Sequence, residues 1–427
     1  MSHLPVRRHS RWYERVFFST TTQIVLVALI STIIPAWVLW RGDFYLSHNP
    51  IRLHTFYGVL LANIGIIFTL RMLLKFPGNK SSSYIISTVI TWYILLLGLF
   101  FIFRLGYSLS LLFISFCATL TYGFVLYFLG RRWIIPKIAV IPLGRAKNLI
   151  LIENATWYVL TDPDDVDSHN RFNMIVTDLH SSELTAKWQK YLADCVLNGL
   201  PVYNARQVEE SLTGRVRIHH MYENQLGSLL PSYVYSLIKR TMDIVLTLVA
   251  LPVALPIMVL AAICIFLEDG KWFMFSQPRV GKGNKEFMMY KFRSMRVDSE
   301  KNGAQFADED DERITRVGKI IRKLRIDELP QLFNVLKGDM SLIGPRPEQR
   351  YFADQFEKQI PFYAYRHIVR PGISGWAQCL QGYAADVENT QIKLEYDFYY
   401  IKHFSLWLDV LIIFKTVKII LTGFGAR

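Results

Sequence analysis

The chain has 427 residues, a hydrophobic fraction of 52% and a mean hydropathy of +0.22, values that disfavour an ordinary soluble protein and predict membrane segments. Its formal net charge of +13 is uneven, with +13 in residues 1–150, −5 in 151–230 and +5 in 231–427. Because the basic residues lie beside apolar runs, an anionic membrane surface or a phosphorylated substrate is favoured over nucleic acid. Neither the four cysteines nor the ten histidines have the spacing of a zinc site.

Four apolar runs in residues 1–136 are each close to the ~20 residues needed to cross a bilayer. They are Gln23–Trp40, Leu53–Leu74, Tyr84–Phe103 and Leu109–Leu129. Basic residues concentrate before the first run, between the second and third runs, and after the fourth: Arg7, Arg8, Arg11, Arg15, Arg71, Lys75, Lys80, Arg131, Arg132 and Lys137. The positive-inside rule then predicts four transmembrane helices with both ends in the cytoplasm. A buried soluble bundle is the alternative.

Residues 137–231 are predicted to form a small cytoplasmic α/β domain. Short β-rich runs at Ile138–Leu143, Trp157–Thr161 and Asn173–Thr177 alternate with polar and helical stretches such as Glu183–Asn198. This order is typical of a partly parallel, Rossmann-like sheet. The turn at Leu143–Ala146 lacks a GxGxxG motif, so a structural or regulatory role is favoured over nucleotide binding.

The apolar run Met242–Leu267 is long enough to span a membrane, but two features disfavour a crossing. Pro252 and Pro256 lie at its centre, where each removes a helical donor and bends the helix. Basic residues flank both ends, whereas a crossing segment is expected to be asymmetric. A re-entrant hairpin at 241–267, broken near the prolines and dipping into one leaflet, explains both features. A fifth span is the alternative.

A last apolar stretch, Phe404–Phe424, has helical spacing with Asp409, Lys415 and Lys418 among its apolar residues. Such a helix lies either in the membrane interface or against the core of its domain, and the sequence favours neither arrangement.

Two adjacent carboxylates, Asp327 and Glu328, follow the cations Arg322, Lys323 and Arg325. Asp is a favourable helix N-cap, so a helix is predicted to begin at Asp327 and to close at a glycine, Gly338. A helix N-terminus beside cations attracts phosphate, and a carboxylate can act as a nucleophile or bind Mg²⁺. The alternative is a capping residue with a surface ion pair.

Four other motifs supply candidate phosphate contacts. In Gly344–Pro347 two prolines fix the backbone around Arg346, whose guanidinium is suited to bidentate phosphate contact. The alternative for this motif is a rigid turn. The remaining candidates are Arg370 and Gln378 in Arg370–Gln378, Arg279 in Gln277–Gly281, and Lys291 in Tyr290–Met295.

In combination and order, these motifs make residues 235–427 resemble the catalytic domain of the monotopic phosphoglycosyl transferases, the bacterial sugar transferase family. The four predicted spans and the α/β domain resemble the large branch, the polyisoprenyl-phosphate hexose-1-phosphate transferases. The matching stretches are Lys239–Arg240 with Asp243, the proline pair, Tyr290–Met295, Arg322 with Asp327–Gln331, Phe333–Met340, Gly344–Pro347 and Arg370–Gln378. One departure is Leu255–Pro256, where the family often has Ser-Pro, with Pro252 added here.

The resemblance implies a membrane α plus α/β protein with three parts: transmembrane residues 1–136, α/β residues 137–231, and a mostly helical catalytic domain at 232–427 with the re-entrant hairpin and interfacial helices. It implies that Asp327 attacks a UDP-sugar, that UMP leaves, and that a covalent phosphosugar intermediate passes to a polyprenyl (undecaprenyl) phosphate. Glu328 would be the partner of Asp327, and Mg²⁺ would bind Asp327, with Glu328 as a further candidate ligand. Arg346, Arg322, Lys291, Arg279, Arg370 and Gln378 would contact phosphate or nucleotide.

The same resemblance implies a bacterial inner-membrane enzyme with its catalytic domain on the cytoplasmic face, near anionic lipid, that starts exopolysaccharide, capsule or O-antigen assembly. The spans and middle domain also offer surface for a homodimer. One rival is a non-catalytic scaffold, which the carboxylate pair among cations disfavours. A second rival is an enzyme with its site inside the spans, but those runs lack the necessary carboxylates.

Overall fold

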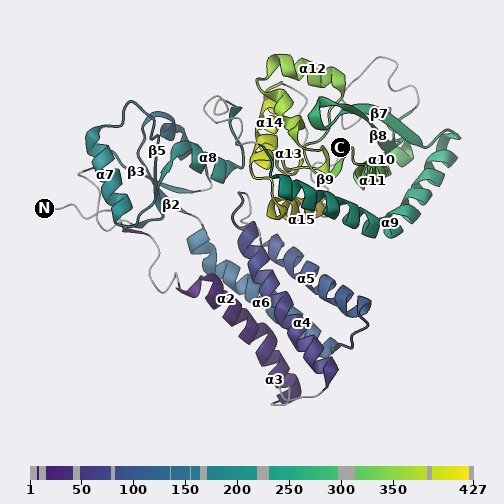
Figure 1. Cartoon of the computed structure of the whole chain (residues 1–427), viewed down its shortest axis with the longest axis horizontal. Helices are drawn as coiled ribbons and strands as arrows, with labels where there is room; N and C mark the ends of the chain where they lie inside the picture. The colour runs from purple at the N-terminus through teal and green to yellow at the C-terminus, as the bar shows by residue number, and fades with distance from the viewer. Residues whose placement is uncertain are drawn as a thin grey trace. The chain divides into compact units, whose positions relative to one another are not determined.

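The computed structural model describes residues 7–8, 16–41, 49–77, 82–134, 136–153, 155–163, 171–218, 230–296, 313–381 and 387–422. The chain divides into two compact units, Met1–Gly214 and Arg215–Arg427 (Figure 1). The predicted boundary at residue 231 follows the segment 219–229, which lies outside the described residues. Residues 215–218, predicted as part of the middle domain, bond instead to Glu395 of the second unit, where the Val216 amide donates to the Glu395 carbonyl at 3.0 Å.

All four apolar runs near the start of the chain are helical. The first is one continuous segment, α2 (Thr20–Ala28), a π-helical turn (Leu29–Ile33) and α3 (Ile34–Trp40). The others are α4 (Pro50–Leu73), α5 (Ser83–Ile102) and α6 (Leu109–Ile134). Side-chain caps set two of the starts, because Ser19 accepts from the Thr22 amide and Asn49 from the Ile51 amide.

A cluster of buried polar side chains joins these helices. Asn63 of α4 donates to Thr32 of the π-helical turn at 2.9 Å and to Ser115 of α6 at 3.3 Å. Its carbonyl oxygen accepts from Thr119 at 2.9 Å and from Tyr93 of α5 at 3.3 Å. Since lipid offers no competing partners, such bonds fix how apolar helices pack on one another.

Replacing Thr119 by Val is expected to lower the unfolding free energy by about 1 kcal/mol, because the Asn63 carbonyl loses its shorter donor. The matched control is Thr121→Val on the same helix, since Thr121 is exposed and, among the described residues, its hydroxyl bonds only to the Cys117 carbonyl one turn back. Denaturant unfolding of the full chain in mild detergent measures both variants. Equal effects of the two substitutions would contradict a stabilising role for the cluster.

The rest of the first unit contains the predicted small parallel sheet. Its four strands run in the order β3 (Thr156–Val159), β2 (Lys137–Val140), β5 (Met174–Thr177) and β6 (Val202–Asn204), all parallel. A 3₁₀ helix (Gly144–Leu151), α7 (Ala186–Leu197) and α8 (Ala205–Thr213) complete the domain. A two-residue pair, β1 (Arg7–Arg8) with β4 (Arg171–Phe172), is also parallel.

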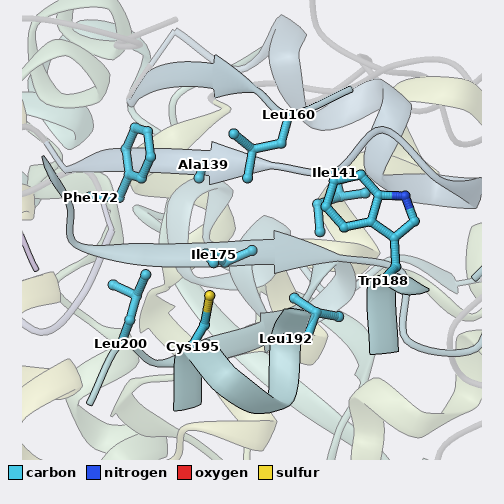
Figure 2. Packing of buried hydrophobic residues seen from close by; sticks show 9 residues of the cluster. All are labelled: Ala139, Ile141, Leu160, Phe172, Ile175, Trp188, Leu192, Cys195 and Leu200. Atoms are coloured by element: carbon cyan, nitrogen blue, oxygen red, sulfur yellow. The ribbon is translucent and has the colours of Figure 1, made fainter. Parts of the chain in front are cut away.

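Both faces of this sheet are covered, which explains why its two central strands, β2 and β5, are almost fully buried. Figure 2 shows one face, where Ala139 and Ile175 on adjacent strands face Leu192 and Cys195 of α7. On the opposite face, the strand residues Ile138, Val140 and Val176 pack on the 3₁₀ helix and α8. The helical residues of this cluster are Ala146, Leu149, Ala205 and Val208. The domain therefore has a conventional two-sided α/β core.

The second unit is mostly helical, as predicted. Its elements are α9 (Tyr233–Asp269), β7 (Met274–Val280), a 3₁₀ turn (Lys282–Asn284), β8 (Glu286–Phe292), α10 (Arg316–Lys323), a 3₁₀ helix (Ile326–Glu328), α11 (Gln331–Lys337), β9 (Ser341–Ile343), α12 (Arg350–Gln359), a 3₁₀ helix (Tyr363–Ile368), β10 (Gly372–Ser374), α13 (Trp376–Leu380), α14 (Val387–Lys402) and α15 (Leu406–Thr422). The antiparallel hairpin β7–β8 and the parallel pair β9–β10 were not predicted.

The prediction of a broken hairpin at 241–267 is wrong in one respect. At the two prolines the structure has a bend in a continuous helix, α9, and no break. Hydrogen bonding is helical from Tyr233 to Asp269, and the helix changes direction part-way along (Figure 1). Each proline removes only one donor, so the bonds on either side persist. Pro252, Leu255 and Pro256 are all exposed. Within the described residues, α9 is one of five helices long and apolar enough to cross a membrane.

One side of α9 packs on its own unit. Ala254, Met258, Ala261 and Ile265 lie against Phe292 of β8, Ile321 of α10 and Leu332 of α11. The other side exposes a row of large apolar residues: Val245, Leu246, Leu248, Val249, Val253, Leu255, Ile257, Val259, Leu260, Ile263, Phe266 and Leu267. The helix is therefore suited to lie between the domain and a lipid phase.

A buried ion pair joins the first turns of α9 to α15. The Lys239 ammonium lies 2.6 Å from the Asp409 carboxylate, which also accepts from the hydroxyls of Tyr235 and Tyr400. On α15, Leu408, Leu411 and Ile412 are fully buried. The sequence left open whether Phe404–Phe424 lies in the membrane interface or packs on the domain core. The first half of α15 packs on the core.

The same turns of α9 reach two other elements. The Arg240 guanidinium donates to the carbonyls of Val335 and Leu336, near the end of α11. Asp243 accepts from the Leu342 amide of β9 at 3.1 Å. The start of α9 is thus bonded to both α11 and β9.

Candidate active site

The two candidate carboxylates lie in a 3₁₀ helix between α10 and α11. Arg325, at φ 57°, turns the chain at the end of α10 and leads directly into this helix. The predicted N-cap role of Asp327 is wrong, because Pro330 occupies the cap of α11. Proline suits this position, since its φ is preset and a donor at a helix start would be unused. Gly338, at φ 100°, closes α11 as predicted.

Glu328 is buried in a cluster of cations. Its Oε1 lies 2.9 Å from Arg346 Nη2, 3.6 Å from Arg325 Nη1 and 3.7 Å from Lys291 Nζ. The side chain is 7% exposed, so these charges interact with little solvent screening. The structure therefore brings together Glu328, Lys291 and Arg346, three residues that the sequence had linked only as candidates.

Asp327 is half-buried and makes no ion pair within the part of the chain that the structure describes. Burial raises the pKa of Asp327 to about 6, and the neighbouring Glu328 carboxylate adds to the rise. Burial also acts on Glu328, but Arg346, Lys291 and Arg325 outweigh it and lower the pKa of Glu328 to about 2. The pair thus consists of a firmly held anion and a second carboxylate whose oxygens are available.

Lys291 and Arg346 respond to the same surroundings in opposite ways. Burial, reinforced by the Arg346 cation, lowers the pKa of Lys291 to about 8. The Glu328 carboxylate raises the pKa of Arg346. Both side chains carry a positive charge at neutral pH and lie where a phosphate approaching Asp327 would be neutralised.

The other predicted site residues lie in three different surroundings. Arg322, in the last turn of α10, lies close enough to Asp327 to lower its pKa. Arg279 of β7 approaches Glu348 at 3.8 Å, one residue beyond the Gly344–Pro347 motif. Arg370 donates to the Gly338 carbonyl at 3.0 Å and so helps to close α11. The structure gives Arg370 no contact with the carboxylate pair.

Gln378 lies on the short helix α13, and its Oε1 atom is buried without a hydrogen-bond partner. The side-chain nitrogen of Gln331, in the first turn of α11, is likewise buried and unpartnered. Buried polar atoms of this kind cost free energy unless a ligand or water satisfies them. Gln378 therefore stays a candidate for substrate contact, and Gln331 is a further one.

Sequence reasoning missed a buried charge network beside Arg346. Glu348 lies 2.6 Å from Lys393, and Arg366 lies 2.8 Å from Asp397. Burial alone would raise the pKa of Glu348, but Lys393, Arg366 and Arg279 lower it to about 2. Glu348 directly follows the Gly344–Pro347 motif, so an extension of that motif by one residue would have found it. The pairing of Arg366 with Asp397 has no signal in the sequence spacing.

A hollow lies beside Arg346, and two proline rings of its own loop form part of the wall. Its lining residues are Val280, Gly281, Pro345, Arg346, Pro347, Arg366, His367, Val369 and Pro371. Burial, together with the Arg366 cation, lowers the pKa of His367 to about 3, so this ring is neutral. Most of the residues that line the hollow are thus uncharged, and Arg346 and Arg366 are its charged lining residues.

The turn at Leu143–Ala146, considered above for nucleotide binding, bonds to carboxylate side chains of the same domain. The Gly144 amide donates to Glu183 at 3.3 Å, and the Arg145 amide donates to Asp178 at 3.1 Å. These amides lie after the carboxyl end of β2, where a phosphate would bind in a Rossmann-like fold. Two carboxylates occupy that place, which agrees with the structural role favoured from the sequence.

Comparison with known proteins gives a family match over most of the second unit and a relative that covers nearly the whole chain. A family described as "Bacterial sugar transferase" matches residues 234–423, which contain every part of the candidate site. A relative from Aeromonas hydrophila, a UDP-N-acetylgalactosamine-undecaprenyl-phosphate N-acetylgalactosaminephosphotransferase, is 53% identical over 421 residues, covering 99% of each chain. The chain belongs to the bacterial sugar transferase family.

Other relatives of this bacterial sugar transferase match shorter stretches. A putative undecaprenyl-phosphate N-acetylgalactosaminyl 1-phosphate transferase of Bacillus subtilis is 53% identical over 132 residues, 31% of this chain and 74% of the relative. A UDP-glucose:undecaprenyl-phosphate glucose-1-phosphate transferase of Escherichia coli is 38% identical over 188 residues, 44% of this chain and 40% of the relative. The family resemblance found in the motifs is confirmed, and the chain is an enzyme of the sugar-phosphate transferase class.

Proposed function

We propose that this enzyme transfers N-acetylgalactosamine 1-phosphate from UDP-N-acetylgalactosamine to undecaprenyl phosphate in the bacterial inner membrane. The transfer chemistry rests on one observation, the available Asp327 carboxylate beside a Glu328 held by three cations. The choice of sugar and lipid rests on the relative that matches along 99% of the chain. The product would be the first lipid-linked sugar of an exopolysaccharide, capsule or O-antigen.

In the first step, an Asp327 oxygen attacks the β-phosphorus of the UDP-sugar. A new P–O bond forms to Asp327 while the bond between this phosphorus and the bridging oxygen breaks, so UMP leaves with the electron pair. Lys291 and Arg346 neutralise charge on the phosphoryl oxygens. Glu328, ionised because of its cations, keeps both side chains directed at the reacting phosphate.

In the second step, a phosphate oxygen of the lipid attacks the same phosphorus. The bond to Asp327 breaks, the carboxylate is regenerated, and the sugar leaves on a lipid diphosphate. A covalent route divides one transfer into two and lets the nucleotide product leave first. The exposed apolar row on α9 supports an arrangement in which the bent helix enters and leaves the same cytoplasmic leaflet. The lipid phosphate would then reach Asp327 at the membrane surface, with the surrounding cations near anionic lipid.

The residues at this site could hold Mg²⁺ through few protein ligands, with substrate phosphates as the others. Among the described residues, no group of three or more His, Cys, Asp or Glu side chains could hold a metal ion. Mg²⁺ typically binds one or two carboxylates together with substrate phosphates, and Asp327 provides one such carboxylate. Glu328 is the weaker candidate ligand, because its Oε1 lies within 4 Å of three cations. When bound there, Mg²⁺ would neutralise negative charge on the donor diphosphate.

Removal of divalent metal is therefore expected to stop sugar-phosphate transfer. Excess EDTA should abolish formation of the lipid product, and added Mg²⁺ should restore it. Ca²⁺ should be less effective, because it prefers more ligands at longer distances than Mg²⁺ does. The measurement is product formation by the full chain in detergent. Undiminished activity in excess EDTA would contradict a role for the metal.

The proposed activity is tested with purified full chain, undecaprenyl phosphate and a panel of radiolabelled UDP-sugars. We expect label in the lipid fraction and UMP release, fastest with UDP-N-acetylgalactosamine. Preference for another UDP-sugar would contradict the sugar assignment alone. No lipid labelling with any donor, although the protein is folded, would overturn the proposed function.

A further inference from the structure

The backbone that carries Arg346 is held almost entirely from outside its own loop. Pro345 and Pro347 have no amide proton, so the loop cannot be held there by its own donors. Its four successive carbonyls all accept hydrogen bonds: Pro345 from the Gly372 amide at 2.9 Å, Arg346 from Arg366 Nη2 at 2.9 Å, Pro347 from Arg279 Nη1 at 3.4 Å, and Glu348 from the Val280 amide at 2.9 Å. The carbonyl of Arg346 itself is the one bound by Arg366.

Arg366 is suited to hold this carbonyl because both terminal nitrogens of its guanidinium have buried partners. Besides the Arg346 carbonyl, it lies 2.8 Å from the Asp397 carboxylate and donates to the Tyr363 hydroxyl at 2.8 Å. Arg366 is 4% exposed and Asp397 is 1% exposed. A buried fork with three fixed partners defines the position of the atom it binds much better than a mobile surface cation does.

Glu348 ties this fork to the rest of the loop. Its carboxylate lies 2.6 Å from Lys393, 3.8 Å from Arg279 and 4.0 Å from Arg366. Arg279 and Arg366, which bind successive carbonyls of the loop, therefore share one anion. At the other end of the loop, the Arg346 side chain reaches Glu328 at 2.9 Å.

We infer that Arg366 is a positioning residue, which acts on the reaction by fixing the Arg346 backbone so that the Arg346 guanidinium stays on Glu328. This inference rests on the proposed function for its activity readout. The competing role is direct contact between Arg366 and the donor, since Arg366 also lines the hollow beside Arg346. The two roles differ in whether the effect of Arg366 depends on Arg346.

The test is a double-mutant cycle on the first step, measured as labelling of the protein by radiolabelled UDP-sugar without lipid. Arg366→Lys keeps a positive charge beside Asp397 but loses the fork, so we expect labelling to slow by about tenfold, the worth of one hydrogen bond to a charged group. In an Arg346→Lys background, which loses the bidentate side chain, the same substitution should have little further effect. Arg350→Lys on α12 is the control, because Arg350 bonds to Glu286 and Asn284 and not to the loop.

Amide hydrogen exchange of residues 341–348 provides a readout that needs no activity. We expect faster exchange in this segment in Arg366→Lys than in wild type or Arg350→Lys. Multiplicative slowing in the double variant would overturn the inference in favour of direct donor contact, and unchanged exchange would also overturn it. If wild type takes no label from any donor, the proposed function fails, while the exchange result still decides whether Arg366 holds the loop.

Discussion

Replacing Asp327 by Asn will abolish transfer of label from the UDP-sugar to the protein. The amide has nearly the same shape as the carboxylate but cannot form the bond to phosphorus, so we expect a loss of at least 10³-fold in labelling and in lipid product. The measurement is labelling by radiolabelled donor in detergent, with and without undecaprenyl phosphate, together with release of UMP.

The same substitution should leave the fold intact. Burial and the Glu328 charge both raise the pKa of Asp327, which means that its ionised form is disfavoured in the folded chain. Removal of that charge should therefore leave the thermal unfolding midpoint unchanged or higher. Asp354→Asn on α12, at an exposed carboxylate paired with Arg350, is the matched control and should label normally. Wild-type labelling by Asp327→Asn would eliminate this residue as the nucleophile.

Replacing Arg346 by Ala should give the second largest loss. It removes the closest cation from Glu328 and a positive charge from the proposed phosphate position, so we expect the first step to slow by about 10²-fold. The pKa of Glu328 should rise, because Arg346 is the largest of the influences that lower it. Lys291 and Arg325 remain near the carboxylate, so the variant should still fold.

Arg346→Lys distinguishes charge from geometry at this position. A lysine keeps the charge but not the planar fork, so its rate should lie between those of wild type and Arg346→Ala. Single-turnover labelling over a range of donor concentrations separates binding of the donor from the chemical step. A rate for Arg346→Ala equal to that of wild type would show that this guanidinium does not act on the reaction.

The parts of this protein that the sequence predicts best are those governed by local pattern. The apolar runs, the small parallel sheet and the adjacency of Asp327 and Glu328 need no knowledge of distant contacts. The proximity of Arg346 to Glu328 was suggested only by two motifs occurring together in the sequence. The structure supplies their 2.9 Å contact.

What could not be predicted depends on pairs far apart in the chain. Arg366 meets Asp397 through packing of a 3₁₀ helix on α14, and no periodicity links the two positions. The hairpin β7–β8 was missed because its strands do not alternate cleanly between apolar and polar residues. The bend in α9 was overestimated as a break, since the flanking helical bonds outweigh the loss at Pro252 and Pro256.

The bonds at the start of α9 have a mechanical consequence. Arg240 donates hydrogen bonds to carbonyls at the end of α11, the helix that follows Glu328. Asp243 accepts a hydrogen bond from β9, the strand that leads to Arg346. The first turns of one helix are thereby bonded to both segments that flank the contact between Glu328 and Arg346. A displacement of the first turns of α9 would therefore act on the two chain segments that carry Glu328 and Arg346.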